Sequence, residues 1–117
     1  MRRVRAVVHH CGIGTISHTL RAGVPSLACP FVFDQPNNAR RLEALGLAEV
    51  ILPHQHRLEY MEPALQRLFA SDASARAQSL RSLVGAEDGV SKACQLLEQT
   101  FGRQEAKPNQ PRCQEKL

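Results

Sequence analysis

The chain has 117 residues, of which 43% are hydrophobic, so it is long enough for one hydrophobic core, and nothing in its composition indicates a second. No apolar stretch approaches the roughly 20 residues needed to cross a bilayer, so we expect no integral membrane segment. The net charge of +4 raises the question of nucleic acid, but the basic residues are scattered and aromatic residues make up only 4%, which argues against such a partner.

The first predicted strand is a nearly unbroken apolar run over residues 4–8, interrupted by Arg5, of the kind found in parallel strands that are covered on both faces. A polar turn follows, in which Gly12 and Gly14 bracket Ile13. Glycines let the backbone come close to a ligand, and the free N–H groups of a helix that opens there point at whatever occupies the site. The turn therefore predicts an anion site.

A helix over residues 16–21 is expected next, with Thr15 at or near its N-cap and Gly23 just past its end. Residues 26–29, which are apolar apart from Ser26, predict a second strand, and a loop follows it. The order is that of a βαβ unit, which indicates a parallel pair of strands.

A second helix and a third strand follow in the same order. Residues 36–45 predict a helix that Gly46 ends, and residues 48–52 predict a third strand. In open α/β sheets ligands bind at the carboxyl ends of the strands. The stretch 10–15 and the pair 34–35 both fall at that edge, so we expect them to form one site.

Helical spacing of apolar residues predicts three more helices, with a break between the last two at residues 85–89. Their ranges are 58–69, 73–84 and 90–101. The tail, residues 102–117, has almost no apolar content and is expected to be disordered.

Four cysteines, Cys11, Cys29, Cys94 and Cys113, are widely spaced and form no CxxC pair. Neither a disulfide framework nor a thiol-based zinc site is indicated, and the histidine spacings also fit no standard zinc site. The basic start of the chain has too short an apolar part for a signal peptide. We therefore expect free thiols and a cytoplasmic protein.

Four motifs carry a family resemblance: HCGIGT at residues 10–15, LRAGVP at 20–25, Pro30, and DQ at 34–35. In order and spacing they resemble the donor-binding signature of GT-B nucleotide-sugar glycosyltransferases, in particular the bacterial and sterol UDP-glycosyltransferase branch, whose pattern reads HHGGxGT, LxxGxP and DQ. The resemblance covers residues 4–101. It implies an α/β fold: a partial Rossmann-like, three-layer GT-B C-terminal domain with a short parallel sheet and C-terminal helices, occupying residues 1–101.

The resemblance also implies a donor site. Its phosphate-binding part lies at His10, Gly12, Gly14 and Thr15, and its sugar-binding part at Asp34 and Gln35. His10 would stabilise the leaving diphosphate, and the acid-amide pair would bind the sugar hydroxyls, a task that suits one acceptor and one group that both donates and accepts. No metal and no cofactor is expected, since the helix dipole and an imidazole replace the metal.

Simpler structural roles compete with these assignments. His10 would otherwise be a strand-end histidine bonded to a carbonyl, and Asp34 would be a helix N-cap, alone or together with sugar binding. His9 is expected to point inward or to pack behind the residues that contact the ligand. Gln35 has little structural reason to be where it is.

The reaction implied is inverting transfer of a hexosyl unit from a UDP-sugar, or a dTDP-sugar, to a hydroxyl of a lipophilic acceptor such as a sterol or polyketide. The catalytic base and the acceptor pocket of the resembling enzymes lie in an N-terminal domain that this sequence does not contain. The chain is then either a fragment of such an enzyme or a truncated relative. The alternative is a non-catalytic nucleotide- or phosphate-binding module, or a degenerate homologue. A sheet of three strands also leaves an apolar face and an edge uncovered, which predicts marginal stability or self-association.

Overall fold

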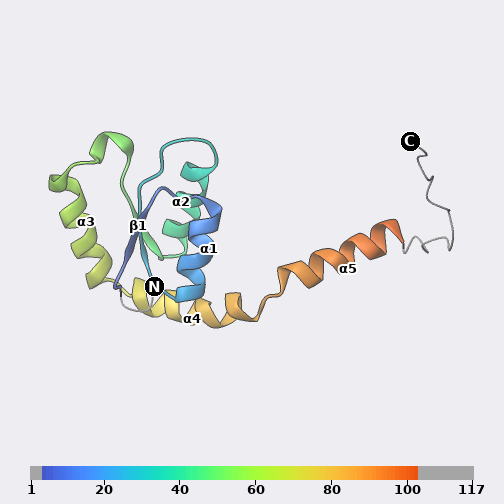
Figure 1. Ribbon diagram of the computed structural model, residues 1–117. Coiled ribbons are helices and arrows are strands. Elements are labelled where there is room, and N and C mark those ends of the chain that lie inside the picture. Colours follow the sequence, from blue (N-terminus) through green and yellow to red (C-terminus); the bar gives the residue numbers. More distant parts are fainter. Residues whose placement is uncertain (1–3, 103–117) are drawn as a thin grey trace, which may run out of the picture. The chain divides into compact units, whose positions relative to one another are not determined.

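The computed structural model describes residues 4–102, and the chain divides into two units between Glu87 and Asp88. Strands and helices alternate through the first half of the first unit, and helices make up the rest (Figure 1). The elements in chain order are β1 (Val7–His9), α1 (Ile13–Ala22), β2 (Ser26–Ala28), α2 (Gln35–Ala44), β3 (Ala48–Val50), a short 3-10 helix η1 (Pro53–Gln55), α3 (Leu58–Ala70), α4 (Ala73–Ala86) and α5 (Gly89–Phe101).

The three strands form one parallel sheet in the order β1-β2-β3. The register pairs His9 with Ala28, and Ala28 with Val50. A helix carries the chain from each strand back to the start of the next, as parallel pairing requires. All three strands therefore end at one edge of the sheet, which is called the carboxyl edge below.

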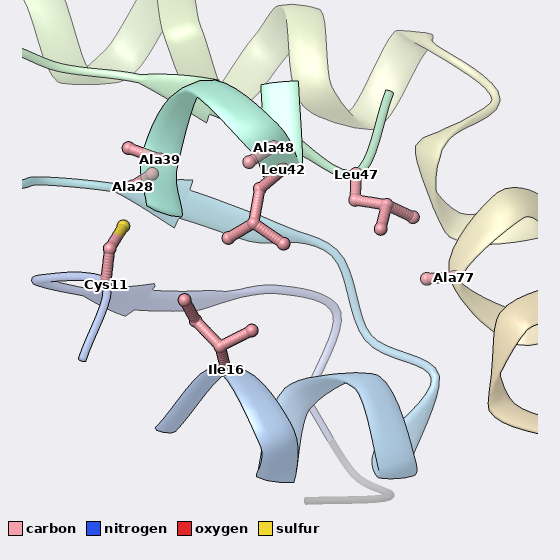
Figure 2. Packing of buried hydrophobic residues seen from close by; sticks show 8 residues of the cluster. All are labelled: Cys11, Ile16, Ala28, Ala39, Leu42, Leu47, Ala48 and Ala77. Atoms are coloured by element: carbon pink, nitrogen blue, oxygen red, sulfur yellow. The ribbon is translucent and has the colours of Figure 1, made fainter. Parts of the chain in front are cut away.

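Helices cover both faces of this sheet. Successive residues of a strand point to opposite faces. In β2, Ala28 belongs to one buried cluster with residues of α1, α2 and α4, whereas Leu27 belongs to a second cluster with Ala64 of α3. In Figure 1, α3 accordingly lies on one side of the sheet and α1 and α2 lie on the other. The first of these clusters is built from small and medium side chains and is drawn in Figure 2; its buried members are Cys11, Ile16, Ala28, Ala39, Leu42, Leu47, Ala48 and Ala77. The predicted three-layer α/β fold is confirmed.

Glycines end α1 and α2 as predicted. Gly23 has φ 68°, its N–H donates to the Leu20 carbonyl (3.1 Å), and the N–H of the next residue reaches back to Thr19 (3.1 Å). Gly46 has the same φ and makes the equivalent bond to Glu43 (2.8 Å). Only glycine adopts this left-handed conformation without steric cost, which is why the sequence marks these ends so clearly.

Some predicted boundaries are wrong. The first strand, predicted over residues 4–8, is Val7–His9 in the structure. Helix α1 begins at Ile13 with Gly12 as its N-cap, so Thr15 lies inside the first turn rather than at or near the cap. Gly85 lies inside α4, and the break before α5 is confined to Glu87 and Asp88. At both helix boundaries the local pattern predicts a turn because it contains glycine, but a helix tolerates glycine at its start and in its interior.

Helix α5 belongs to the second unit and has no buried residue among those described. Its start is capped by Asp88, whose carboxylate accepts the Ser91 N–H (3.1 Å). The tail predicted to be disordered lies outside the described residues, apart from Gly102. Within residues 4–102, no helix combines the length and the apolar character needed to cross a membrane.

Candidate functional site

The two predicted halves of the site lie at the same edge of the sheet. Residues 10–15 follow β1 directly and open α1, whereas Asp34 and Gln35 follow β2 and open α2. Because β1 and β2 are paired neighbours, both stretches leave the sheet side by side at the carboxyl edge. The position expected from the sequence is confirmed by the topology.

The turn between β1 and α1 bends at Cys11. This residue is fully buried and has φ 68°, a left-handed conformation that costs an L-residue with a side chain roughly 1–2 kcal/mol. Its backbone is held on both sides: its N–H donates to Nδ1 of His9 (3.0 Å), and its carbonyl accepts from Nδ2 of Asn38 (3.1 Å). The shape of the turn is therefore fixed by side chains from β1 and α2.

His9 is a structural residue of this site. Since its Nδ1 accepts the Cys11 N–H, the ring proton is on Nε2, which donates to the hydroxyl oxygen of Ser26 (2.9 Å). Burial lowers the pKa of His9, and the neighbouring His10 lowers it further. The neutral imidazole points inward, as expected from the sequence, and uses both nitrogens to tie the turn to β2.

His10, in contrast, is exposed and lies against the backbone of Gly12. A Cβ added at Gly12 would come within 2.9 Å of Nε2 of His10, so any side chain there would displace the imidazole. A Cβ at Gly14 would meet nothing within 4 Å, because that position faces open space. Glycine at position 12 therefore places His10 next to the start of α1, and position 14 leaves the space in front of the helix open.

The start of α1 has the electrostatic character of an anion site. The first N–H groups of an α-helix have no acceptor within the helix, and the helix dipole adds partial positive charge there. The first turn of α1 contains no acidic side chain, so this charge is not neutralised from within the helix. Gly14 and Thr15 both lie in that turn.

Asp34 and Gln35 are both engaged in local bonds. Oδ2 of Asp34 accepts from Nδ2 of Asn38 (2.8 Å), and Asp34 stands at the N-cap position of α2 without a side-chain capping bond among the described residues. Oε1 of Gln35 accepts the N–H groups of Phe31 (3.0 Å) and Val32 (3.2 Å). The view that Gln35 lacks a structural role is wrong, because its side chain fixes the loop before α2.

Asn38 also belongs to the candidate site, although none of the sequence motifs includes it. Its Nδ2 donates both to Asp34 and to the carbonyl of Cys11, so one amide joins the predicted sugar-binding stretch to the predicted phosphate-binding turn. Its position four residues after Asp34 on a predicted helix is a signal for the first bond. The second bond joins residues 27 positions apart and depends on the strand pairing.

The two buried cysteines next to the site are inert thiols. Burial and the nearby Cys29 raise the pKa of Cys11 to about 11, and burial raises that of Cys29 as well. Thiols that stay protonated are poor nucleophiles and poor metal ligands. Both side chains therefore act as small apolar groups beneath the turn.

The family model of the glycosyltransferase family 28 C-terminal domain matches residues 1–97. The chain belongs to this family. The match covers more than the sheet and the site, since it runs through α4 and into α5. The predicted resemblance to GT-B glycosyltransferases is thereby confirmed.

Relatives of this family 28 domain are named glycosyltransferases. O-mycaminosyltylonolide 6-deoxyallosyltransferase of Streptomyces fradiae is 39% identical over 101 residues, which are 85% of this chain and 24% of the relative. Sterol 3-beta-glucosyltransferase UGT80A2 of Arabidopsis thaliana is 34% identical over 92 residues, 78% of this chain and 14% of the relative. The chain spans a quarter or less of the length of these relatives.

A solved structure has the same fold. Spinosyn rhamnosyltransferase SpnG in complex with thymidine diphosphate aligns with a TM-score of 0.73 at 26% sequence identity, over 83% of this chain and 27% of that one. The family 28 domain described here therefore corresponds to part of a larger GT-B enzyme fold.

Proposed function

We propose that this chain supplies the donor-binding part of a glycosyltransferase that moves a hexosyl unit from a UDP-sugar, or a dTDP-sugar, to a hydroxyl of a lipophilic acceptor such as a sterol or polyketide. One observation carries the proposal: the glycine turn and the Asp34–Gln35 pair lie at one sheet edge and are joined by Asn38. The names of the relatives and the thymidine diphosphate bound in the structural neighbour support this assignment.

In the proposed reaction the bond between the sugar's anomeric carbon and the diphosphate oxygen breaks, and its electron pair stays on the diphosphate. The N–H groups of Gly14 and Thr15, the dipole of α1 and the imidazole of His10 stabilise the charge that develops there. The Thr15 hydroxyl adds a further donor. Gly12 contributes by letting His10 lie close to the turn.

The sugar hydroxyls are assigned to Asp34 and Gln35. Oδ2 of Asp34 is shared with Asn38, which leaves Oδ1 to accept from a hydroxyl. Oε1 of Gln35 already accepts two backbone N–H groups, so this side chain would act on the sugar through its amide N–H groups. Asn38 orients the carboxylate and is a positioning residue.

The remaining parts of the enzyme lie outside this chain in the proposal. The acceptor hydroxyl forms the new bond to the anomeric carbon and passes its proton to a base in an N-terminal acceptor domain. No metal ion or cofactor takes part, because the helix dipole and His10 supply the positive charge, and the reaction is placed in the cytosol. Binding of the donor should accordingly persist in the presence of EDTA.

The test is an amide NMR titration of the labelled 117-residue chain with UDP, UDP-glucose, dTDP and GDP. Shifts confined to the start of α1 are expected with UDP or dTDP, and further shifts at residues 34–35 with UDP-glucose. His10→Ala should weaken UDP binding about tenfold, the loss of one hydrogen bond to a charged group.

The matched control is His18→Ala, which removes an exposed histidine from α1 outside the turn. This variant should bind UDP as the parent chain does. A well-dispersed spectrum that responds to none of the nucleotides would contradict the donor site and favour a degenerate, non-catalytic module. Equal effects of the two histidine variants would remove His10 from the site.

A further inference from the structure

Three consecutive apolar residues are exposed immediately before the predicted sugar-binding pair. Phe31, Val32 and Phe33 lie within the loop that connects β2 to α2, and they are 56%, 50% and 92% exposed. Large apolar side chains that are exposed together mark a contact surface more often than single ones do. This segment is called the aromatic loop below.

The aromatic loop has a defined shape. The Gln35 side chain binds two of its N–H groups, and the Gln35 N–H donates to the carbonyl of Val32 (3.2 Å). The ring of Phe31 packs edge-on against His56, with centroids 4.8 Å apart and an interplanar angle of 77°. Phe31 is thus anchored, and the conformation of the aromatic loop is maintained by Gln35, the same residue that is assigned to sugar binding.

Phe33 has an unusual backbone for its type. Its φ is 59°, in the left-handed region that bulky L-residues rarely adopt. Packing does not explain this conformation, because the side chain is almost fully exposed. The loop thus holds an aromatic ring in solvent at the cost of a strained backbone, and such strain clusters at ligand-binding sites.

Further apolar groups follow the other two strands at the carboxyl edge. Ile13, at the start of α1, is 68% exposed, and Leu52, just beyond β3, is 46% exposed. Each of the three strands therefore leads into exposed apolar side chains at the edge that carries His10 and Asp34. The polar donor site is accompanied by apolar surface.

We propose that the aromatic loop is this chain's contribution to acceptor binding, and that Phe33 contacts the apolar body of the acceptor. The inference rests on the proposed function. For transfer, the acceptor oxygen must come within about 3–3.5 Å of the anomeric carbon of the bound sugar. Groups directly beside the sugar-binding pair are then positioned to meet the acceptor, and here those groups are apolar. A hydroxylated polycyclic molecule, such as a steroid, fits this chemistry.

The test is ¹⁹F NMR of the full chain labelled with 4-fluorophenylalanine. The sequence contains four phenylalanines, Phe31, Phe33, Phe69 and Phe101, so four resonances report on four places. Hydrocortisone, a neutral hydroxysteroid of fair solubility, is titrated in the presence of UDP. We expect the resonances of Phe31 and Phe33 to shift in a saturable way, and those of Phe69 and Phe101 to stay.

Two variants separate contact from folding. Phe33→Gly removes the ring and suits the left-handed φ, and Phe33→Asn replaces the ring with a polar group that tolerates the same conformation. Both should weaken hydrocortisone binding at least fivefold and leave UDP binding unchanged. Phe101→Leu, a change on α5, is the control and should alter neither.

The outcomes distinguish this inference from the proposed function. Saturable UDP shifts at Gly14 and Thr15 without any hydrocortisone shift at residues 31 and 33 would overturn the acceptor role and leave the donor site standing. Parallel shifts of all four fluorines would mean nonspecific binding and would also overturn it. A chain that responds to hydrocortisone at the aromatic loop but not to any nucleotide would contradict the proposed function instead.

Discussion

Two adjacent histidines have opposite surroundings at the carboxyl edge. His9 is 8% exposed and uses both ring nitrogens within the protein, whereas His10 is exposed and lies on Gly12. Adjacent residues at the end of a strand point to opposite sides, so one histidine builds the turn and the other faces the proposed donor site. The division of roles follows from strand geometry and needs no difference in residue type.

The buried histidine makes stability depend on pH. The pKa of His9 is lowered in the folded chain, so below about pH 6.5 the unfolded chain binds a proton that the folded chain does not. The free energy of unfolding should therefore be highest above pH 6.5 and should decrease as the pH falls, by at most about 1.4 kcal/mol per pH unit from this group. Urea unfolding between pH 7.5 and 5 measures the effect.

His9→Asn is the comparison for this prediction. Asparagine places an acceptor near the position of Nδ1 and does not titrate, so the variant should lose less stability than the parent over the same pH range. If the free energy of unfolding falls by the same amount in both chains, the pH dependence comes from other groups. The NMR titration of the His9 ring then identifies whether its pKa is lowered at all.

At the scale of elements, the site is made where α1 and α2 begin. Both helices start at the carboxyl edge, and Asn38 on α2 is bonded to the turn that precedes α1. The turn itself is strained at Cys11, so its shape depends on bonds from outside the turn. The relative placement of the two helix starts therefore depends on one amide side chain.

Asn38→Ala removes both of its hydrogen bonds. We expect the free energy of unfolding to fall by about 1–2 kcal/mol, because the Cys11 carbonyl loses its side-chain partner. The gain in affinity of UDP-glucose over UDP should shrink, since the carboxylate of Asp34 is no longer oriented. Calorimetric titration with both nucleotides measures the difference.

Asn37→Ala is the matched control for this prediction, because the neighbouring asparagine is exposed and makes no side-chain hydrogen bond within residues 4–102. This variant should change neither the free energy of unfolding nor the difference in affinity between UDP-glucose and UDP. A result in which the two alanine variants behave alike would show that Asn38 does not couple the two halves of the site.

At the scale of the whole molecule, the unpaired side of the edge strand β1 is the feature that most favours self-association. The backbone N–H and C=O groups of Val7 and His9 face β2. Those of Val8 therefore point to the opposite side of β1, where the described residues include no further strand. The Val8 side chain shares its face with Leu27 and is 52% exposed, because α3 packs over β2 and β3. An unpaired edge beside an uncovered apolar residue favours association.

We therefore expect the 117-residue chain to be marginally stable or to self-associate. Sedimentation velocity over a range of concentrations should detect dimers or larger species, and Val8→Lys should reduce them because a charge on an edge strand opposes pairing. Leu45→Lys adds the same charge at an equally exposed apolar position, 54% exposed, and should have a smaller effect. A monomer that melts cooperatively above about 65 °C, the upper range for mesophile domains, would contradict the prediction.

Sequence alone was sufficient for the order of the strands and α-helices, although not for the short 3-10 helix η1, and for the edge that carries the candidate site. Apolar runs, helical spacing and the glycines at positions 23 and 46 are local signals, and parallel connection then places the ends of β1 and β2 together. The motifs at residues 10–15 and 34–35 could be assigned to one site for that reason. Assignment of the α1 start failed, because a glycine serves equally well in a turn and as an N-cap.

The tertiary structure alone decided how the two halves of the site are connected. The bond from Asn38 to Cys11, the anchoring of His9 on Ser26 and the packing of Phe31 on His56 each join distant parts of the chain. Such contacts depend on strand register and helix placement, which no local pattern encodes. Local composition thus determined which residues are present at the edge, and long-range packing determined which of them hold the turn and which remain free for a ligand.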